Sequence, residues 1–540
     1  MLIDLQLYTQ DFESKFIFET TKLYLIQSKT RIQDGSFSLP EYLDYINLIL
    51  TQENDKILHY LDISTRRLLN PCIRKQLIET HIEAIINKGF DDLLRAERIK
   101  ELHLMYDFIC SVKNGEENLR AAFEEFIKKE GYELVRYPEK DKTMIKELLD
   151  FKKSIDVIIV QAFKDNGKFI ISMKKGFEKF INMRPNKPAE MIAKYLDAML
   201  IAGHKGASSD EELDTNMDKI MVIFRFIYGK DIFEGFYKQN LSKRLLHGKS
   251  ASVDAEKAML IKLKQECGPD FTSKLEEMFK DIELSMDLSH TFKEQSNKKQ
   301  CLDMNVNVLS KANWPSYQGA KVNMPIELSS SLGNFQTYYK SNYSGRTLEW
   351  QHSLGHCKLK ANFPLRSKEL HVSFFQTLVL LLFNSSNVIT FQKISEITSI
   401  TTKELKMTLI ALTMGKVKVL QKSLKGTNIE NDTEFIYNEN FNHHLHSIKI
   451  NQVQMKESEE ENDKTRTKVI YDRNMQMDAG IMRIMKTRKK LNHSNLLREL
   501  SEQSNFPIRQ ADFKKRIENL IEHDYIKRNE DEPNLYEYLA

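Results

Sequence analysis

The first 180 residues contain one amphipathic helix pattern after another, and this succession limits the fold more than any other feature of the sequence. Apolar residues recur there at the three- and four-residue spacing of helices that bury one face. Glycine and proline are scarce, 19 and 11 among 540 residues, and we expect short breaks at Asn70-Pro71 and Gly131-Tyr132. An all-helical stretch of this length predicts an array that provides reach and rigidity. Its helices are expected at residues 11–26, 41–61, 73–86, 91–112, 119–129 and 143–163.

Residues 181–295 continue as a second helical block, which we predict to be a helical bundle. Pro188 suits the first turn of a helix, because its fixed φ angle and missing N–H are tolerated there. Consecutive helices with short connections are typical of bundles. The helices are expected at residues 217–227, 233–246, 255–266 and 272–288.

Between residues 296 and 373 the apolar pattern changes from helical spacing to alternation, which predicts an α/β sheet subdomain. A small sheet in a helical protein can leave one edge unpaired, and such an edge can accept a strand from another chain. The alternative is an ordinary subdomain whose own helices cover the edge, and the pattern does not separate the two. Strands are expected at residues 305–309, 348–354, 357–363 and 370–373.

Two later segments share one arrangement, three helices followed by a β-hairpin, which is the order found in winged helices. The first spans residues 374–452 and the second spans residues 474–540. Between them, residues 453–473 are charged and lack apolar periodicity, so we predict a flexible linker. The chain is thus predicted to be mainly α-helical with a smaller α/β portion.

One lysine of the second unit stands where packing does not require it. Ile481, Ile484 and Met485 form an apolar stripe at helical spacing, and Lys486 falls on the opposite face. No acidic residue lies between positions 483 and 490. A solvent-facing lysine with basic neighbours suits recognition or modification by another protein, although an ordinary solvated helix face is the alternative.

Composition argues against several classes of function. The formal net charge of +4 is the small difference between 80 basic and 76 acidic residues, so no overall field points to nucleic acid or a membrane. Five scattered cysteines without a CxxC pair encode neither a disulfide framework nor a zinc site. No apolar run is long enough to span a bilayer and no signal peptide is recognisable, so we expect a protein of the cytoplasm and nucleus.

Nucleic-acid binding and catalysis are both disfavoured. The last long helix pattern, residues 509–524, carries four basic and four acidic side chains, whereas a helix that reads a DNA groove should be net basic. His352, His356 and Cys357 lack the third partner that a metal site or a Cys–His pair needs, so we expect them to be structural. No catalytic residue, metal site or cofactor is predicted.

Several strings of the sequence resemble the cullins, the scaffold subunits of multisubunit RING ubiquitin ligases. The resemblance covers essentially the whole chain, is dense from about residue 180 onward, and is closest to the type-four cullins. It implies helical cullin repeats, a four-helix bundle, an α/β sheet and two winged helices. It rests on Phe236-Tyr237-Lys238-Gln239-Asn240-Leu241-Ser242-Lys243-Arg244-Leu245-Leu246, Ser250-Ala251-Ser252, Leu354-Gly355, Ile484-Met485-Lys486 and Tyr536-Glu537-Tyr538-Leu539-Ala540.

The resemblance also implies partners and sites. The sheet region of Leu348 and Trp350 would accept a strand from an Rbx-type RING protein, and Lys486 would be the isopeptide acceptor for a Nedd8-like modifier. A scaffold of this kind makes no bonds itself, but brings a substrate lysine close to a charged ubiquitin-conjugating enzyme. A basic patch for that enzyme is implied at Lys238, Lys243 and Arg244. A basic face around the acceptor lysine is expected at Arg483, Arg488 and Lys490.

The sequence departs from the type-four cullins at its start. It begins well inside the family's helical arm and is expected to lack the first repeat, which grips a propeller-type adaptor, so adaptor binding is left open. Two hypotheses remain, a working ligase scaffold and a non-catalytic protein that sequesters the RING subunit without delivering substrate. A winged-helix nucleic-acid-binding protein is the least favoured reading.

Overall fold

The computed structural model describes residues 8–33, 38–201, 210–295, 302–317, 319, 321–364, 366–414, 417–423, 428–450 and 459–539. The chain divides into two compact units, one of Met1–Leu196, Asp214–Phe233 and Ile481–Ala540, the other of Asp197–Leu213 and Glu234–Gly480. Within the described ranges the fold is mainly helical with three small sheets, which confirms the predicted fold class. None of the described helices has the length and apolar character needed to cross a membrane.

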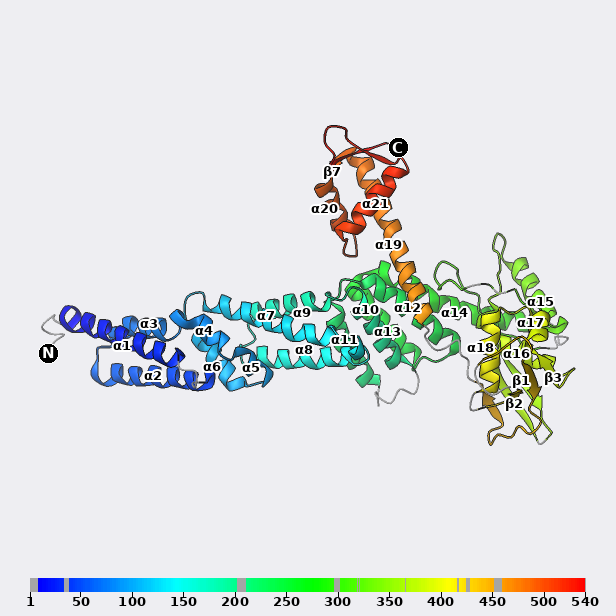
Figure 1. Ribbon diagram of the computed structural model, residues 1–540, viewed down its shortest axis with the longest axis horizontal. Helices are drawn as coiled ribbons and strands as arrows, with labels where there is room; N and C mark the ends of the chain where they lie inside the picture. Colours follow the sequence, from blue (N-terminus) through cyan, green and yellow to red (C-terminus); the bar gives the residue numbers. More distant parts are fainter. Residues whose placement is uncertain are drawn as a thin grey trace. The chain divides into compact units, whose positions relative to one another are not determined.

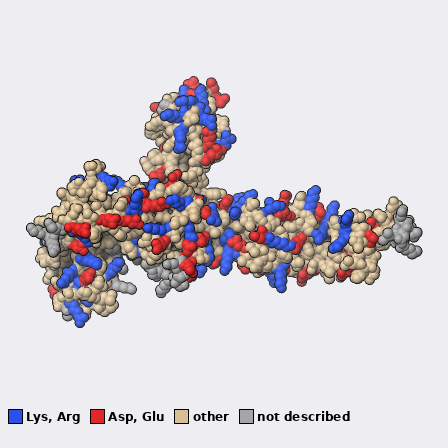
Figure 2. All heavy atoms as spheres, turned by 180° about the vertical axis from the view of Figure 1, so that it is seen from behind, with Lys and Arg blue, Asp and Glu red and all other residues tan. Residues whose placement is uncertain are grey.

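The first unit begins with an array of helices in which α7, α8 and α9 run side by side (Figure 1). On the face shown in Figure 2, basic and acidic side chains are intermixed over this array, so that face presents no single-sign surface. The elements are η1 (Tyr8–Glu13), α1 (Ser14–Gln33), α2 (Leu39–Tyr60), η2 (Ile63–Thr65), α3 (Arg66–Leu77), η3 (Glu79–His81), α4 (Ile82–Asn87), α5 (Phe90–Arg95), α6 (Ile99–Ile109), α7 (Gly115–Val135), η4 (Pro138–Lys140), α8 (Met144–Gln161) and α9 (Gly167–Ile181).

Both predicted helix breaks are wrong. Pro71 lies inside α3, where the helix continues because Leu69 and Ile73 on either side of it are fully buried. Gly131 lies inside α7, and a Cβ atom built there would be 2.3 Å from the ring of Phe180 on α9. The glycine therefore serves close packing of two helices rather than a turn.

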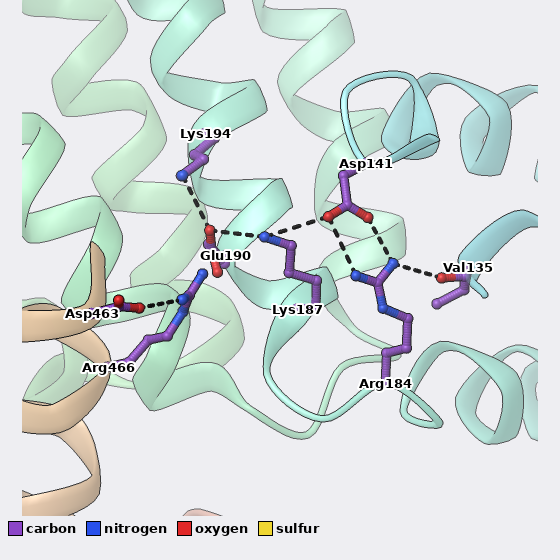
Figure 3. A network of polar contacts seen from close by, with 8 residues as sticks. All are labelled: Val135, Asp141, Arg184, Lys187, Glu190, Lys194, Asp463 and Arg466. Atoms are coloured by element: carbon purple, nitrogen blue, oxygen red, sulfur yellow. Dashed lines mark hydrogen bonds and ion pairs between the residues drawn. The ribbon is translucent and has the colours of Figure 1, made fainter. Parts of the chain in front are cut away.

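A polar network holds the connection between α9 and α10 (Lys187–Leu200) (Figure 3). Arg184 donates to Asp141 Oδ1 at 2.6 Å and to the carbonyl of Val135 at 2.8 Å. Lys187 bridges Asp141 and the buried Glu190, at 3.4 and 3.1 Å, and Lys194 binds the same Glu190 oxygen at 3.1 Å (Figure 3). The charged segment that opens the second helical block is thus an ordered junction.

Residues 181–295 contain the helices α10 to α14 within their described parts, so the predicted four-helix bundle remains a prediction. In the first unit α10 is followed by most of α11 (Asp210–Phe224). In the second unit lie α12 (Lys230–His247), which begins at the boundary, α13 (Val253–Cys267) and α14 (Pro269–Gln295).

The α/β portion contains two sheets over one hydrophobic core. Strands β1 (His356–Asn362) and β2 (Ser367–Ser373) pair antiparallel, and β6 (Ser447–Lys449) pairs parallel with β2. The second sheet has the order β3-β5-β4. Because Leu370 and Val372 share a core with Phe375 and Leu409, the predicted boundary after residue 373 does not separate two cores. The remaining elements are α15 (Ile326–Asn342), η5 (His352–Leu354), α16 (Phe374–Leu382), β3 (Val388–Thr390), α17 (Phe391–Thr398), α18 (Thr402–Thr413), β4 (Leu420–Lys422) and β5 (Glu434–Tyr437).

The predicted flexible linker is wrong where it is described. Residues 459–473 belong to α19 (Glu459–Arg488), one helix of 30 residues, and the preceding part of the predicted linker lies outside the described residues. Three glutamates lie in its first turn, where the positive end of the helix dipole stabilises their negative charge. Ion pairs then hold the first part of the helix within the second unit, from Glu461 to Lys243 at 2.7 Å and from Glu460 to Lys403. Charge contacts with distant segments replace the apolar stripe that the sequence lacks.

The chain ends in a small domain of helices and a three-stranded sheet of order β7-β9-β8. Its last helix lies within the helix pattern predicted at residues 509–524, and its last two strands pair as a hairpin. Assigning either segment to the winged helices remains a prediction. The elements are the end of α19, β7 (Lys490–Asn492), α20 (His493–Gln503), α21 (Gln510–Glu522), β8 (Ile526–Arg528) and β9 (Leu535–Tyr538).

Candidate docking groove and modification site

Lys486 lies in the last turn of α19 and is exposed, as the apolar stripe predicts. On the opposite face Ile481, Ile484 and Met485 are at most 4% exposed. The lysine therefore projects from a helix that its own domain core holds in place. Its role as an acceptor remains a prediction at this stage.

The predicted basic face around Lys486 is only partly a helix face. The helix ends at Arg488, because Lys489 adopts a left-handed φ of 66° and donates its N–H to the carbonyl of Met485 at 2.8 Å. Lys490 lies on β7, not on the helix, and pairs with Glu537 at 2.6 Å. Arg488 pairs with Glu499 at 3.3 Å. Arg483 stays exposed on the helix, one turn before Lys486.

The second unit contains a groove with a volume of about 2220 Å³. Pockets for small molecules measure about 300–1,000 Å³, so this groove is large enough for a segment of polypeptide. Residues 302–311 line it, and so do residues 346–352 and 354–359. These two segments include the predicted strands at 305–309 and 348–354, and neither is a strand within the described ranges.

Two serines of α14 hold the first segment. Ser289 Oγ donates to the carbonyl of Val306 at 2.9 Å and accepts its N–H at 3.1 Å, while Ser285 Oγ accepts the N–H of Val308 at 2.8 Å. Serines four residues apart on a helix are about 6 Å apart, which matches two residues of extended chain at about 3.3 Å each. Residues 305–309 therefore run extended along α14, with one edge bonded to its serine side chains.

The other edge of this segment carries unpaired backbone groups. In an extended chain, alternate residues direct N–H and C=O to opposite edges, so Asn305, Asn307 and Leu309 direct theirs away from α14. Among the described residues, none of these groups has a hydrogen-bond partner. Such a row of donors and acceptors is a template for strand addition.

The second segment presents a similar edge. Its burial alternates, with Leu348 and Trp350 half-buried and Glu349 exposed. Both half-buried side chains pack against Phe335 and its neighbours, and the rings of Trp350 and Phe335 have centroids 6.0 Å apart. Within the described chain, the backbone groups of residues 346–350 make no hydrogen bonds to other backbone groups. The predicted strand is thus wrong, while the docking role of Leu348 and Trp350 remains a prediction.

One end of the groove is basic. His247, Lys249, His356 and Lys449 all line it. Sequence reasoning missed His247, which meets His356 at a sequence separation of 109 residues, and it treated His356 as a structural residue. It also missed Ser285 and Ser289, although two serines four residues apart on one helix face were a readable signal.

The predicted surface patch for a conjugating enzyme is wrong for Arg244. Its guanidinium is 2% exposed and binds Glu256 at 2.6 and 2.9 Å as well as Asp197. Lys243 is occupied by Glu461, as described above. Burial, together with the charges of Lys274 and Lys468, lowers the pKa of Lys238 to about 8. Lys243 and Arg244 therefore serve ion pairs within their unit.

Comparison with known proteins relates all parts of the chain to one family. Residues 1–289 match the cullin alpha solenoid domain, residues 308–441 the cullin alpha+beta domain, and residues 472–532 the cullin protein neddylation domain. The chain is 49% identical to Cullin-4A of Mus musculus over its whole length, which covers 71% of that protein. It is 39% identical to Cullin-4 and 38% identical to Cullin-3 of Dictyostelium discoideum, again over the whole chain and over 71% and 76% of those proteins.

Proposed function

Because this chain belongs to the cullin family, it is a scaffold subunit of a cullin-RING ubiquitin ligase, and we propose that its RING partner adds a strand to the groove of the second unit. We propose further that Lys486 accepts a Nedd8-like modifier. In general terms its partners are a RING subunit, a ubiquitin-conjugating enzyme and that modifier.

The observation that carries the docking proposal is the pair of unpaired edges. The backbone groups of Asn305, Asn307 and Leu309 on one segment, and of residues 346–350 on the other, lack backbone partners among the described residues, and both segments line one groove. A strand placed between them would pair with both edges and cover the half-buried Leu348 and Trp350. An Rbx-type RING protein is the partner that family membership supports.

The modification proposal rests on the position of Lys486 within the matched neddylation domain, residues 472–532. An acceptor lysine must reach a thioester held by another protein. It must therefore be exposed, and the helix that carries it must be held rigidly by its domain core. Lys486 meets both conditions, because Ile484 and Met485 anchor the same helical turn. Addition of a folded modifier would change which arrangements of the bound RING are populated.

The scaffold contributes to ubiquitin transfer by proximity. Holding a substrate lysine near a charged conjugating enzyme raises its effective concentration and thus converts a bimolecular encounter into an intramolecular one. The chain needs no catalytic side chain for this task.

A tagged pulldown tests the modification proposal. Wild type, Lys486→Arg and the control Lys490→Arg are isolated from cells and digested, and the modifier remnant is located by mass spectrometry. We expect the remnant at residue 486 in wild type and in Lys490→Arg, whose arginine keeps the ion pair with Glu537, and its loss in Lys486→Arg. A remnant that persists in Lys486→Arg would refute the assignment.

Backbone chemistry tests strand addition. Asn307→Pro removes the N–H that faces the groove, whereas Asn307→Ala removes only an exposed side chain. We expect the alanine variant to retain the RING subunit in the pulldown and the proline variant to lose it. Equal retention of the RING subunit by both variants would contradict docking at this edge. The same samples address the sequestering hypothesis, because a sequestering protein would retain the RING subunit without ubiquitinated substrates.

A further inference from the structure

Two histidines from distant segments meet at one end of the groove. Nδ1 of His247, the last residue of α12, lies 2.6 Å from Nε2 of His356, the first residue of β1, and the rings stack with centroids 4.7 Å apart. Only one proton fits between the two nitrogens, so one ring donates and the other accepts. His356 is exposed and His247 is half-buried, so the pair is accessible from the groove that both residues line.

The surroundings of the pair are cationic. Burial first, then His356, Lys249, Lys243 and Lys449, lower the pKa of His247 to about 4. Burial and Lys449 also lower the pKa of Lys249. His352 on η5, whose pKa burial lowers, stacks on Phe374 instead of on the pair.

Two acidic side chains on neighbouring elements are engaged with other cations. On α19, Glu461 binds Lys243 at 2.7 Å. On β2, Glu369 lies 3.3 Å from His371 and 3.9 Å from Lys358 of β1. The lysines that act on His247 are thus Lys243 of α12, Lys249 just after that helix and Lys449 of β6, and the two carboxylates described here are bonded to other cations.

From this arrangement we infer that the end of the groove formed by His247, Lys249, His356 and Lys449 binds a carboxylate side chain of the added strand, and that the histidine pair takes up one proton when it does. This inference rests on the proposed strand addition. The occupant is a peptide strand because the same groove contains the two unpaired backbone edges, and charge complementarity selects an acidic side chain at this end.

The proton balance is simple. In the free chain the two rings share one N–H···N hydrogen bond, and the lowered pKa of His247 favours the neutral form of its ring. A bound carboxylate favours the protonated form of a ring beside it, so one proton moves from solvent to the free nitrogen of the donor ring, and the shared hydrogen bond is kept. The carboxylate then faces one imidazolium and the two lysines. Because the bound carboxylate raises the pKa of His247 above its value of about 4 in the free chain, affinity rises as the pH falls toward that value.

The test uses the full chain and its Rbx-type RING subunit, purified separately. Isothermal titration at pH 6.0 in two buffers of different ionisation enthalpy gives the number of protons taken up on binding. We expect net uptake with wild type and none with His247→Gln. Lys449→Gln, at an exposed position, should weaken binding about tenfold and reduce its salt dependence. The controls Lys360→Gln and His446→Gln change exposed residues outside the groove lining and should behave as wild type.

Hydrogen exchange at Asn305, Asn307 and Leu309 separates the two levels of the argument. Protection of these amides on RING binding, without proton uptake and without an effect of Lys449→Gln, would overturn the carboxylate site and leave strand addition intact. Absence of protection would overturn both. Protection together with proton uptake that His247→Gln abolishes would support the site.

Discussion

The serine contacts of α14 make a quantitative prediction about the first groove edge. Ser289→Ala removes the hydrogen bonds to both the N–H and the C=O of Val306, and both residues are less than 10% exposed. Each bond contributes about 1 kcal/mol net, so the local cost is about 2 kcal/mol. Alanine has a better helix propensity than serine by about 0.5 kcal/mol. This difference affects exchange at Val306 only if the opening that exposes the amide also unfolds the turn of α14 that contains residue 289. We therefore expect the amide of Val306 to exchange about 30-fold faster, since 1.4 kcal/mol is a factor of ten.

Ser285→Ala should have a smaller effect. The hydroxyl oxygen of Ser285 lies 2.5 Å from the carbonyl oxygen of Asp281 and 3.2 Å from that of Val308, so its one proton is shared between two acceptors. The main loss at Val308 is therefore the hydrogen bond that its N–H donates to this hydroxyl. About 1 kcal/mol corresponds to about fivefold faster exchange at Val308.

Hydrogen exchange resolved to single amides measures both effects on the full chain. Ser273→Ala, at an exposed position of the same helix whose hydroxyl bonds only within α14, is the matched control and should leave both amides unchanged. The reasoning is refuted if Ser289→Ala leaves Val306 unaffected, or if Ser285→Ala has the larger effect. Either result would mean that the segment is held by its side chains rather than by this backbone ladder.

Further predictions concern packing, buried charge and acid stability. Gly131→Ala should destabilise the helical array by about 1–3 kcal/mol, because its Cβ would overlap the Phe180 ring. The control Gly167→Ala adds a Cβ that meets no atom within 4 Å and should be neutral or stabilising. Chemical denaturation followed by the helical circular dichroism signal compares the two variants. Arg244→Met should cost about 3–5 kcal/mol by leaving the buried Glu256 uncompensated, and Lys243→Met about 1 kcal/mol or less; limited proteolysis at increasing temperature would reveal a reversed order. A hydrogen bond from Lys490 first, then one from Asn529, lowers the pKa of Glu537 to about 2. The ionised carboxylate therefore stabilises the terminal domain above about pH 4.5, and this stabilisation is lost as the pH falls toward 2. In an acid titration followed by circular dichroism, Glu537→Gln should lack this pH-dependent part of the stability.

Helix positions were predictable wherever the signal is local. The apolar spacing and caps around residues 391–398 define α17, whose N-cap Thr390 accepts the N–H of Lys393, and the stripe of Phe513, Ile517 and Leu520 defines α21. Lys486 could be located for the same reason, because its exposure follows from its immediate neighbours.

Positions decided by distant partners could not be predicted. The charged residues 459–473 lack an apolar stripe, yet Lys243 and Lys403 from other helices fix them in α19. Arg244 resembles a surface cation until Glu256 and Asp197 are placed beside it. The ring that stacks on His247 belongs to His356, 109 positions later in the sequence. Each case depends on a charge or ring that only the tertiary fold supplies.

The two wrong strands carry the most information about function. Alternation at residues 305–309 and 348–354 correctly reports which side chains face the core, since Val306 is 8% exposed and Leu348 and Trp350 are half-buried. A strand, however, is defined by its ladder partner, and alternation does not state where that partner comes from. On the first segment one edge is satisfied by Ser285 and Ser289, and the other edge has no partner among the described residues. The sequence has strand-like alternation on both sides of the groove, and no described strand lies between the two segments. This pattern is expected of a sheet that a strand from another chain completes.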